Sequence, residues 1–278
     1  MKARIICSVS FALVLLATGF FLLPILSKTQ SDMDAIRKAA EQGHAEAQCS
    51  LGNMYYSGEG VTKDYAEAAT WYRKAAEQGQ AVAQYSLGFM YYTGEGVTKD
   101  YAEAAKWFRK AAEQGLAVAQ CSLGNMYYYG EGVTKDYAEA VAWYRKAAEQ
   151  GNAEAQYFLG DMYYYGKGVT KDYAEAATWF RKAAEQGDAV AQCRLGGMYY
   201  YGQGVTKDYA KAATWFRKAA EQGHAVAQFR LGLMYSNGQG VIKNEVDGLA
   251  WWYLAKSNGY DSDVADRDIQ QAEKKLGT

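Results

Sequence analysis

The sequence predicts an all-α protein, an α-solenoid of tandem helix-turn-helix repeats wound into a right-handed superhelix. Three observations support this fold class. A glycine-led unit recurs every 36 residues, apolar residues inside each unit are spaced as on helices, and the composition is skewed towards 25 tyrosines and 29 glycines with a single proline. Such a skew is expected when one unit is copied many times, and stacked copies bury a continuous core between neighbours.

The predicted organisation is six repeats between two capping segments. Residues 28–42 are expected to form a linker and an N-terminal capping helix, and residues 259–278 a C-terminal capping helix. Such caps are needed because a stack of repeats otherwise ends on an open apolar face. The repeats between them span 43–78, 79–114, 115–150, 151–186, 187–222 and 223–258. The apolar side of the C-terminal helix is expected to hold Ala265, Ile269, Ala272 and Leu276.

Each repeat is expected to form two helices joined by a glycine-containing loop. In the first repeat, apolar residues recur at helical spacing from Ala47 to Tyr55. Gly58 ends this helix, because glycine accepts the left-handed conformation that follows a helix. The second helix begins after the N-cap residue Asp64, and Glu67 three residues later completes a capping-box pattern that returns in later repeats.

Small residues beside large ones predict close packing within and between the helix pairs. Gly52 and Ala68 permit close approach of two helices, while Leu51 and Tyr55 fill the space between pairs. One tryptophan per repeat is predicted to lie in the core and not in a ligand cage. These residues are Trp71, Trp107, Trp143, Trp179, Trp215 and Trp251.

The first residues read as an export signal. Lys2 and Arg4 precede an apolar run over residues 5–26, which is long enough to span a bilayer, and no small-x-small cleavage site follows it. Residues 1–27 are therefore expected to be a signal peptide or an uncleaved signal anchor, and the anchor is favoured. The positive charges place residues 30–278 on the extracytoplasmic side, in a bacterial periplasm at the inner membrane, or outside the cell if the signal is cleaved.

Charge and residue types argue against nucleic acid, metal ions and catalysis. The 30 basic and 31 acidic residues alternate along the chain and form no basic patch. His44 and His224 are far apart in a stack and have no ligand set around them, and the GEGVTK loop lacks the order of a phosphate-binding loop. No cofactor, metal or enzymatic activity is predicted. The remaining enzyme hypothesis, cell-wall hydrolysis by Glu154 and Asp161, has no support from their spacing.

The cysteines do not predict an internal disulfide framework. Cys49, Cys121 and Cys193 lie 72 residues apart, at the same place in alternate repeats. If neighbouring repeats stack at about 10 Å, these sulfurs are roughly 20 Å apart, which is beyond disulfide reach. We expect them to act as small apolar side chains in helix packing, with an intermolecular bridge as the alternative. Cys7 lies inside the apolar run and is not a lipidation site.

The repeat resembles a known family. Six copies between residue 33 and about residue 259 follow the pattern A-x-x-x-L-G-x-x-Y-x-x-G-x-G-V-x-x-D-x-x-x-A-x-x-W-[YF]-x-x-A-A-x-x-G. This pattern resembles the Sel1-like repeat, a relative of the tetratricopeptide repeat with a longer inter-helix loop. The resemblance implies an adaptor or regulatory protein that holds partners on a concave face, in bacterial envelopes or among secreted proteins. A cysteine-rich branch of that family carries paired cysteines in each repeat, and this chain has at most one, so the disulfides of that branch do not transfer.

Variation between the copies predicts where a partner binds. The first-helix positions that differ most are those of Glu46, Cys49, Ser50, Asn53 and Ser57, whose spacing of three, four and seven places them on one stripe. By resemblance to tetratricopeptide arrays, this stripe lines the concave groove. Beside it runs a tyrosine ladder with one ring per repeat, Tyr56, Tyr92, Tyr128, Tyr164 and Tyr200. The predicted groove residues are Tyr56, Tyr85, Phe89, Tyr92, Tyr128, Tyr129, Tyr157, Asp161, Tyr164, Tyr165, Arg194, Tyr200, Tyr201 and Arg230.

Two interpretations of the tyrosine ladder stay open. Tyrosine offers a rigid apolar ring with a polar tip, which suits a peptide segment or a sugar chain, but the same rings could pack against the next hairpin. The predicted function is a non-enzymatic protein–protein interaction scaffold of the cell envelope, with a protein partner in the groove. The alternative is binding of peptidoglycan or another glycan. Membrane contact is expected only through the N-terminal segment.

Overall fold

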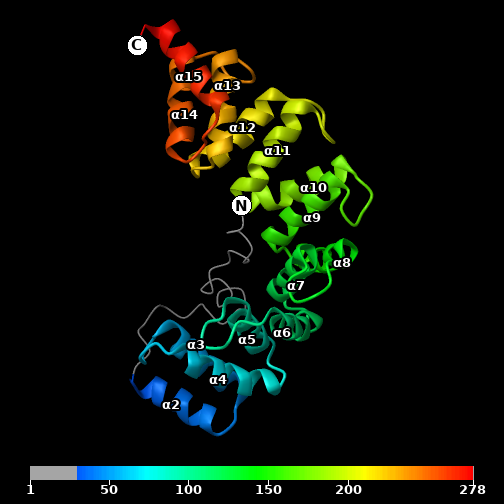
Figure 1. The fold of residues 1–278 in the computed structure, drawn as a ribbon, viewed down its shortest axis with the longest axis vertical. Helices are drawn as coiled ribbons and strands as arrows, with labels where there is room; N and C mark the ends of the chain where they lie inside the picture. The colour runs from blue at the N-terminus through cyan, green and yellow to red at the C-terminus, as the bar shows by residue number, and fades with distance from the viewer. Residues whose placement is uncertain (1–29, 278) are drawn as a thin grey trace. The chain divides into compact units, whose positions relative to one another are not determined.

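Each repeat folds into two α-helices joined by a glycine-containing loop. The computed structural model describes residues 30–277, and within them the regular structure is entirely helical (Figure 1). The described residues divide after Gln150 into two compact units. The first unit holds α2 (Gln30–Glu41), α3 (Ala45–Ser57), α4 (Tyr65–Glu77), α5 (Ala81–Thr93), α6 (Tyr101–Glu113), α7 (Ala117–Tyr129) and α8 (Tyr137–Glu149). The second holds α9 (Ala153–Tyr165), α10 (Tyr173–Glu185), α11 (Ala189–Tyr201), α12 (Tyr209–Glu221), α13 (Ala225–Asn237), α14 (Glu245–Ser257) and α15 (Asp263–Leu276).

The ends of the helices follow from local sequence. Gly58 closes α3 in the left-handed conformation at φ 80°, as predicted. Asp64 caps α4, because its Oδ1 accepts hydrogen bonds from the backbone N–H groups of Ala66 at 2.9 Å and Glu67 at 3.1 Å. The prediction of a full capping box is wrong, because the N–H of Asp64 donates instead to the carbonyl of Tyr55 at 2.9 Å. That bond ties the loop back to the first helix.

In each repeat, the most deeply buried aromatic ring belongs to the residue directly after the tryptophan that was predicted to lie in the core. Ala68, Tyr72 and Ala76 lie four residues apart on one stripe of α4 and are buried against α3. A residue one position along a helix points about 100° away, so the tryptophan sits at the edge of this stripe. The equivalent deep rings are Tyr72, Phe108, Tyr144, Phe180, Phe216 and Trp252.

The prediction that every tryptophan is core is therefore only partly right. Trp143 and Trp179 are buried, whereas the remaining four are half-buried. On Trp71, one face of the indole carries the ammonium group of Lys74 at 3.9 Å from the ring centroid. Those four are Trp71, Trp107, Trp215 and Trp251.

A buried glutamine near the start of a first helix joins that helix to the preceding helix and to the end of its own repeat. Gln84 is buried and donates from Nε2 to the carbonyl of Ala76 in the preceding repeat at 3.1 Å. Its Oε1 accepts from Nε2 of Gln114, at the end of its own repeat, at 2.7 Å. Both polar atoms of a buried amide are thus satisfied, which avoids the cost of desolvating an unpaired group. Gln48, Gln120 and Gln192 form the same pair of bonds, and Gln228 does so with Asn258 as the donor to its Oε1.

The last helix covers the end of the second unit. Ser262 caps α15, and Ala265, Ile269 and Ala272 are buried in one cluster with Trp252. Leu276, predicted to share this apolar side, is 37% exposed because it lies in the final turn of the helix. Across the described residues 30–277, no helix has the length and apolar character needed to cross a membrane. The predicted signal or anchor at residues 1–27 lies outside the described residues.

Candidate partner-binding face

The structure divides the predicted groove residues into buried, half-buried and exposed groups. Tyr85 is 3% exposed and packs against Phe108 with ring centroids 5.4 Å apart, so it belongs to the core and its prediction as a groove residue is wrong. Asp161 is 8% exposed. Nine are half-buried, namely Tyr56, Phe89, Tyr92, Tyr128, Tyr157, Tyr164, Arg194, Tyr200 and Arg230. Three are exposed, namely Tyr129, Tyr165 and Tyr201, at 40%, 49% and 55%.

The tyrosine ladder connects one repeat to the next. Tyr56 donates its hydroxyl to Glu95 Oε2 at 2.8 Å, across to the loop of the following repeat, and its ring lies 5.0 Å from that of Tyr65. Burial and the Glu95 carboxylate together raise the pKa of Tyr56. Tyr92, Tyr164 and Tyr200 donate to Glu131, Gln203 and Gln239 in the same way. These contacts favour the packing interpretation for the four rings, which serve as inter-repeat clamps.

Part of the variation between copies reflects packing within a repeat. Asn53 Oδ1 accepts from the hydroxyl of Tyr72 at 2.7 Å, and Asn125 Oδ1 accepts from Tyr144 at 2.6 Å. Repeats with phenylalanine at the deep ring have no asparagine at the facing position, since no hydroxyl needs an acceptor there. The two asparagines therefore satisfy buried tyrosines. Comparing the two positions across the copies would have revealed this pairing.

In the second unit, the equivalent position carries an ion pair. Asp161 Oδ1 lies 3.6 Å from Nη2 of Arg194, and the guanidinium carbon of Arg194 lies 5.9 Å from the ring centroid of Tyr165. Burial raises the pKa of Asp161 above its usual value, and the positive charges of Arg194 and Lys167 oppose that rise. Burial and the Asp161 charge raise the pKa of the neighbouring Tyr157, and Arg194 opposes this.

The same contact between arginine and tyrosine recurs one repeat later. Arg230 Nη1 donates to the hydroxyl of Tyr201 at 3.2 Å. Burial raises the pKa of the Cys193 thiol to about 11, and the positive charges of Arg194 and Arg230 oppose this rise. We name Tyr165, Arg194, Tyr201 and Arg230 the arginine–tyrosine cluster.

Gly197 leaves the middle of this cluster open. It lies three residues after Arg194 and four before Tyr201 in α11, on the same stripe of the helix. A Cβ built at Gly197 would meet no atom within 4 Å, unlike one at Gly196, which would meet the Phe216 ring at 2.9 Å. The helix therefore presents bare backbone between the two charged and aromatic pairs.

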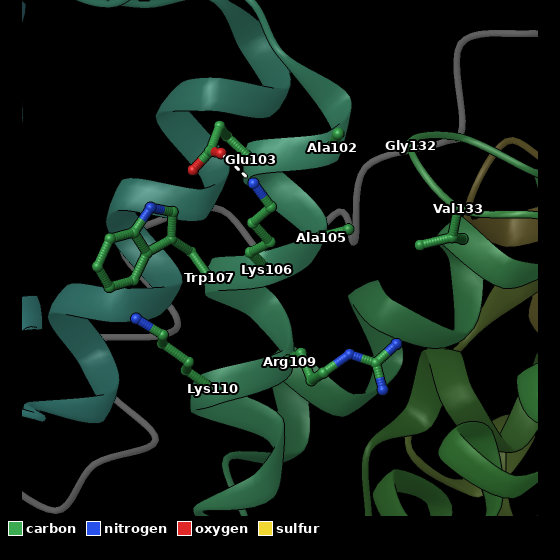
Figure 2. Close-up of a pocket in the computed structure, with 9 residues that line it drawn as sticks. All are labelled: Ala102, Glu103, Ala105, Lys106, Trp107, Arg109, Lys110, Gly132 and Val133. Atoms are coloured by element: carbon green, nitrogen blue, oxygen red, sulfur yellow. Dashed lines mark hydrogen bonds and ion pairs between the residues drawn. The ribbon is translucent and has the colours of Figure 1, made fainter.

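A shallow hollow of about 450 Å³ in the first unit offers a different surface (Figure 2). It lies along α6, beside the Gly132 loop, and is lined by three cations. Each cation already has a partner: Lys106 pairs with Glu103, Arg109 donates to Tyr127, and Lys110 lies 4.1 Å from the centroid of Trp107. Figure 2 shows the Lys106–Glu103 bond and the Lys110 amine below the indole. The hollow therefore has few unengaged groups for a ligand.

Residues with metal-binding or nucleophilic chemistry are not grouped. Among the described residues there is no set of three or more His, Cys, Asp or Glu side chains that could hold a metal ion. His224 serves as a helix cap, with Nδ1 accepting from the N–H of Ala227 at 3.2 Å. Cys49 and Cys121 are buried free thiols, and Cys193 is a half-buried one.

The repeats matched by a known protein family agree with the helix boundaries. The Sel1 repeat family model matches residues 45–80, 81–116, 117–152, 153–188, 189–224 and 225–260, so each match begins at the first residue of a first helix. Comparison with curated proteins gives no match.

Two solved structures share the fold and much of the sequence. A protective antigen of uropathogenic Escherichia coli strains, which displays an SLR fold, is 42% identical over 88% of this chain with a TM-score of 0.83. This chain covers 52% of that antigen, about half of its length. A Sel1 repeat protein from Oxalobacter formigenes is 37% identical over 82% of this chain and 98% of its own, with a TM-score of 0.71.

Proposed function

We propose that this chain, which belongs to the Sel1 repeat family, is an envelope scaffold whose first-helix face holds a protein partner. Sel1 repeat proteins generally mediate protein–protein interaction, and their solenoid fold is typically a non-catalytic scaffold. The proposal goes further by assigning the contact to one face of the second unit. It also assigns the scaffold to the bacterial periplasm, at the inner membrane.

The arginine–tyrosine cluster is the observation that carries this proposal. Tyr165 and Tyr201 expose about half of their surface although each ends a helix that is otherwise packed. Tyrosine and arginine are enriched at the energetic centres of protein interfaces, because they combine a large contact area with directional hydrogen bonds. The ladder hydroxyls of Tyr164 and Tyr200 are engaged in the next repeat, which leaves fewer polar tips for a sugar chain.

The compartment forms the second part of the proposal. Sel1 repeat proteins are often extracytoplasmic in bacteria. We assign residues 1–27 to an uncleaved anchor that holds the repeats in the periplasm at the inner membrane. Fractionation of cells and mass determination of the N-terminus test this assignment. A mature terminus between residues 17 and 31 would show that the signal is cleaved and the protein released.

Site-specific photo-cross-linking in cells tests the binding face. A photoreactive benzoylphenylalanine at Tyr201, and in a second variant at Lys182 on α10 as a control, is expected to give protein adducts only at Tyr201. Sedimentation of the protein with purified cell wall tests the competing glycan hypothesis. Adducts at neither position together with co-sedimentation would replace the protein partner by a glycan.

A further inference from the structure

We infer that the arginine–tyrosine cluster binds an acidic segment of the partner protein, with the two guanidinium groups receiving its carboxylates and the two tyrosine rings flanking it. This inference rests on the proposed function and adds the chemistry of the partner. It comes from the charges of the second unit, the geometry of the two arginine–tyrosine contacts and the open backbone at Gly197.

The protein balances the charge of Arg194 with a single carboxylate and gives Arg230 none within the described residues. Within residues 30–277, Arg230 has no ion-pair partner, and its guanidinium group donates to the neutral hydroxyl of Tyr201. Arg194 has one carboxylate, Asp161, at 3.6 Å, which is long for a charge-assisted hydrogen bond. The side chain of Arg194 remains 40% exposed. A guanidinium group has five N–H donors, so Arg194, which also contacts Tyr157 and Asp161, and Arg230 each keep donors for a carboxylate of the partner.

The repeats that carry Arg194 and Arg230 lack the loop glutamate of the first three repeats. The loop position that accepts the ladder hydroxyl is glutamate in the first three repeats and lysine or glutamine in the last three. Over the same repeats, the position of Arg194 and Arg230 changes from serine through phenylalanine to arginine. The loop residues are Glu59, Glu95, Glu131, Lys167, Gln203 and Gln239, and the helix residues are Ser50, Ser86, Ser122, Phe158, Arg194 and Arg230.

These loop residues adjoin the cluster. Gln239 accepts from Tyr200 at 2.9 Å, and the Tyr200 ring lies 4.9 Å from that of Tyr201. Lys167 places its ammonium group 5.5 Å from the ring centroid of Tyr165. The face is therefore cationic through both the removal of carboxylates and the addition of guanidinium groups. Such a field favours a negatively charged partner and repels a positively charged one.

The rings and the glycine shape the face for an extended chain. Tyr165 and Tyr201 occupy the same position in consecutive repeats, each beside the arginine that follows it by 29 residues. Between them, the missing side chain at Gly197 lets a bound segment approach the α11 backbone. An aromatic or aliphatic side chain between two carboxylates can fill this space, while the acids meet the arginines.

Fluorescence anisotropy on the full-length protein in mild detergent tests the inference. The probe is a pool of fluorescein-labelled peptides carrying Glu-Glu-x-Glu in a Gly-Ser background, with x as Leu, Phe or Tyr, and the matched pool replaces Glu by Gln. The glutamate pool is expected to bind, and its affinity to fall when salt rises from about 50 to about 200 mM. The glutamine pool is expected not to bind.

Paired variants assign the binding to the cluster. The double variant Arg194→Gln with Arg230→Gln is expected to lower affinity for the glutamate pool at least ~10-fold, because both carboxylate donors are lost. Lys182→Gln with Lys218→Gln makes the same charge change on the second helices and is expected to retain binding. Arg194→Lys with Arg230→Lys keeps the charge but loses the paired donors, so it should fall between the two. Matching melting curves establish that each variant is folded.

Three results would overturn the inference: no binding of the glutamate pool, equal binding of the glutamine pool, or full binding by the double glutamine variant. These failures are separable from failure of the proposed function. If cross-linking at Tyr201 still captures proteins in cells while the acidic pool does not bind, the scaffold stands and only the acidic chemistry is wrong. If neither occurs, both are wrong.

Discussion

Two adjacent glycines of α11 provide a sharp test of how closely the paired helices approach. A Cβ on Gly196 would lie 2.9 Å from Cδ1 and 3.0 Å from Cε1 of the buried Phe216 ring, whereas one on Gly197 would meet nothing within 4 Å. Alanine at either position gains about 1 kcal/mol of helix propensity. Gly197→Ala is therefore expected to raise the free energy of unfolding by about 1 kcal/mol.

Gly196→Ala receives the same gain and also forces the methyl group against a ring that cannot move away. Overpacking of this kind costs about 1–3 kcal/mol. Because both variants share the propensity gain, the difference between their free energies of unfolding isolates the packing cost and should itself be about 1–3 kcal/mol.

Urea unfolding followed by far-ultraviolet circular dichroism measures this difference. The two variants have the same composition and differ only in which adjacent position of one helix carries the methyl group. Equal unfolding midpoints would refute the close approach of α11 and α12. The same approach recurs in the first unit, where a Cβ on Gly124 would lie 2.7 Å from the Tyr144 ring, so Gly124→Ala is expected to follow Gly196→Ala.

Three further predictions concern buried polar groups. Tyr144→Phe should lower the free energy of unfolding by about 1–3 kcal/mol, because Asn125 Oδ1 loses its donor in a buried site. Adding Asn125→Phe reproduces the pair Phe89 and Phe108 of the second repeat and should recover part of the loss in the same urea assay. Burial raises the pKa of Asp161 above its usual 3.8, so protonated Asp161 stabilises the fold fully below pH 3.8, and this stability is lost as pH rises through the raised pKa of the folded state. The urea midpoint of the wild type relative to Asp161→Asn should therefore fall as pH rises over this range. A pH-independent difference would contradict the raised pKa. Burial raises the pKa of Cys49 to about 12 and of Cys193 to about 11, so a disulfide reagent at pH ~8 should modify both thiols far more slowly in the native protein than in urea, and equal rates would show that they are exposed.

The sequence by itself determined the helix pairs and their ends. Periodicity, the glycine after each first helix and the aspartate or asparagine before each second helix act within a few residues of the chain, so local chemistry is enough to place them. The repeat family followed from the same pattern, because six copies leave little room for another arrangement.

Only the tertiary structure decided what the variable and aromatic positions do. Asn53 lies on the predicted stripe and Tyr56 lies beside it, yet Tyr56 donates to the loop of the next repeat and Asn53 accepts from a buried hydroxyl. Their partners lie 39 and 19 residues away, so no local pattern shows the contact. The arginine–tyrosine cluster likewise depends on Arg194 and Arg230 reaching back to the helix end of the preceding repeat. Exposure, burial and charge balance arise only when the repeats are packed, because each repeat completes its surface with atoms from its neighbours.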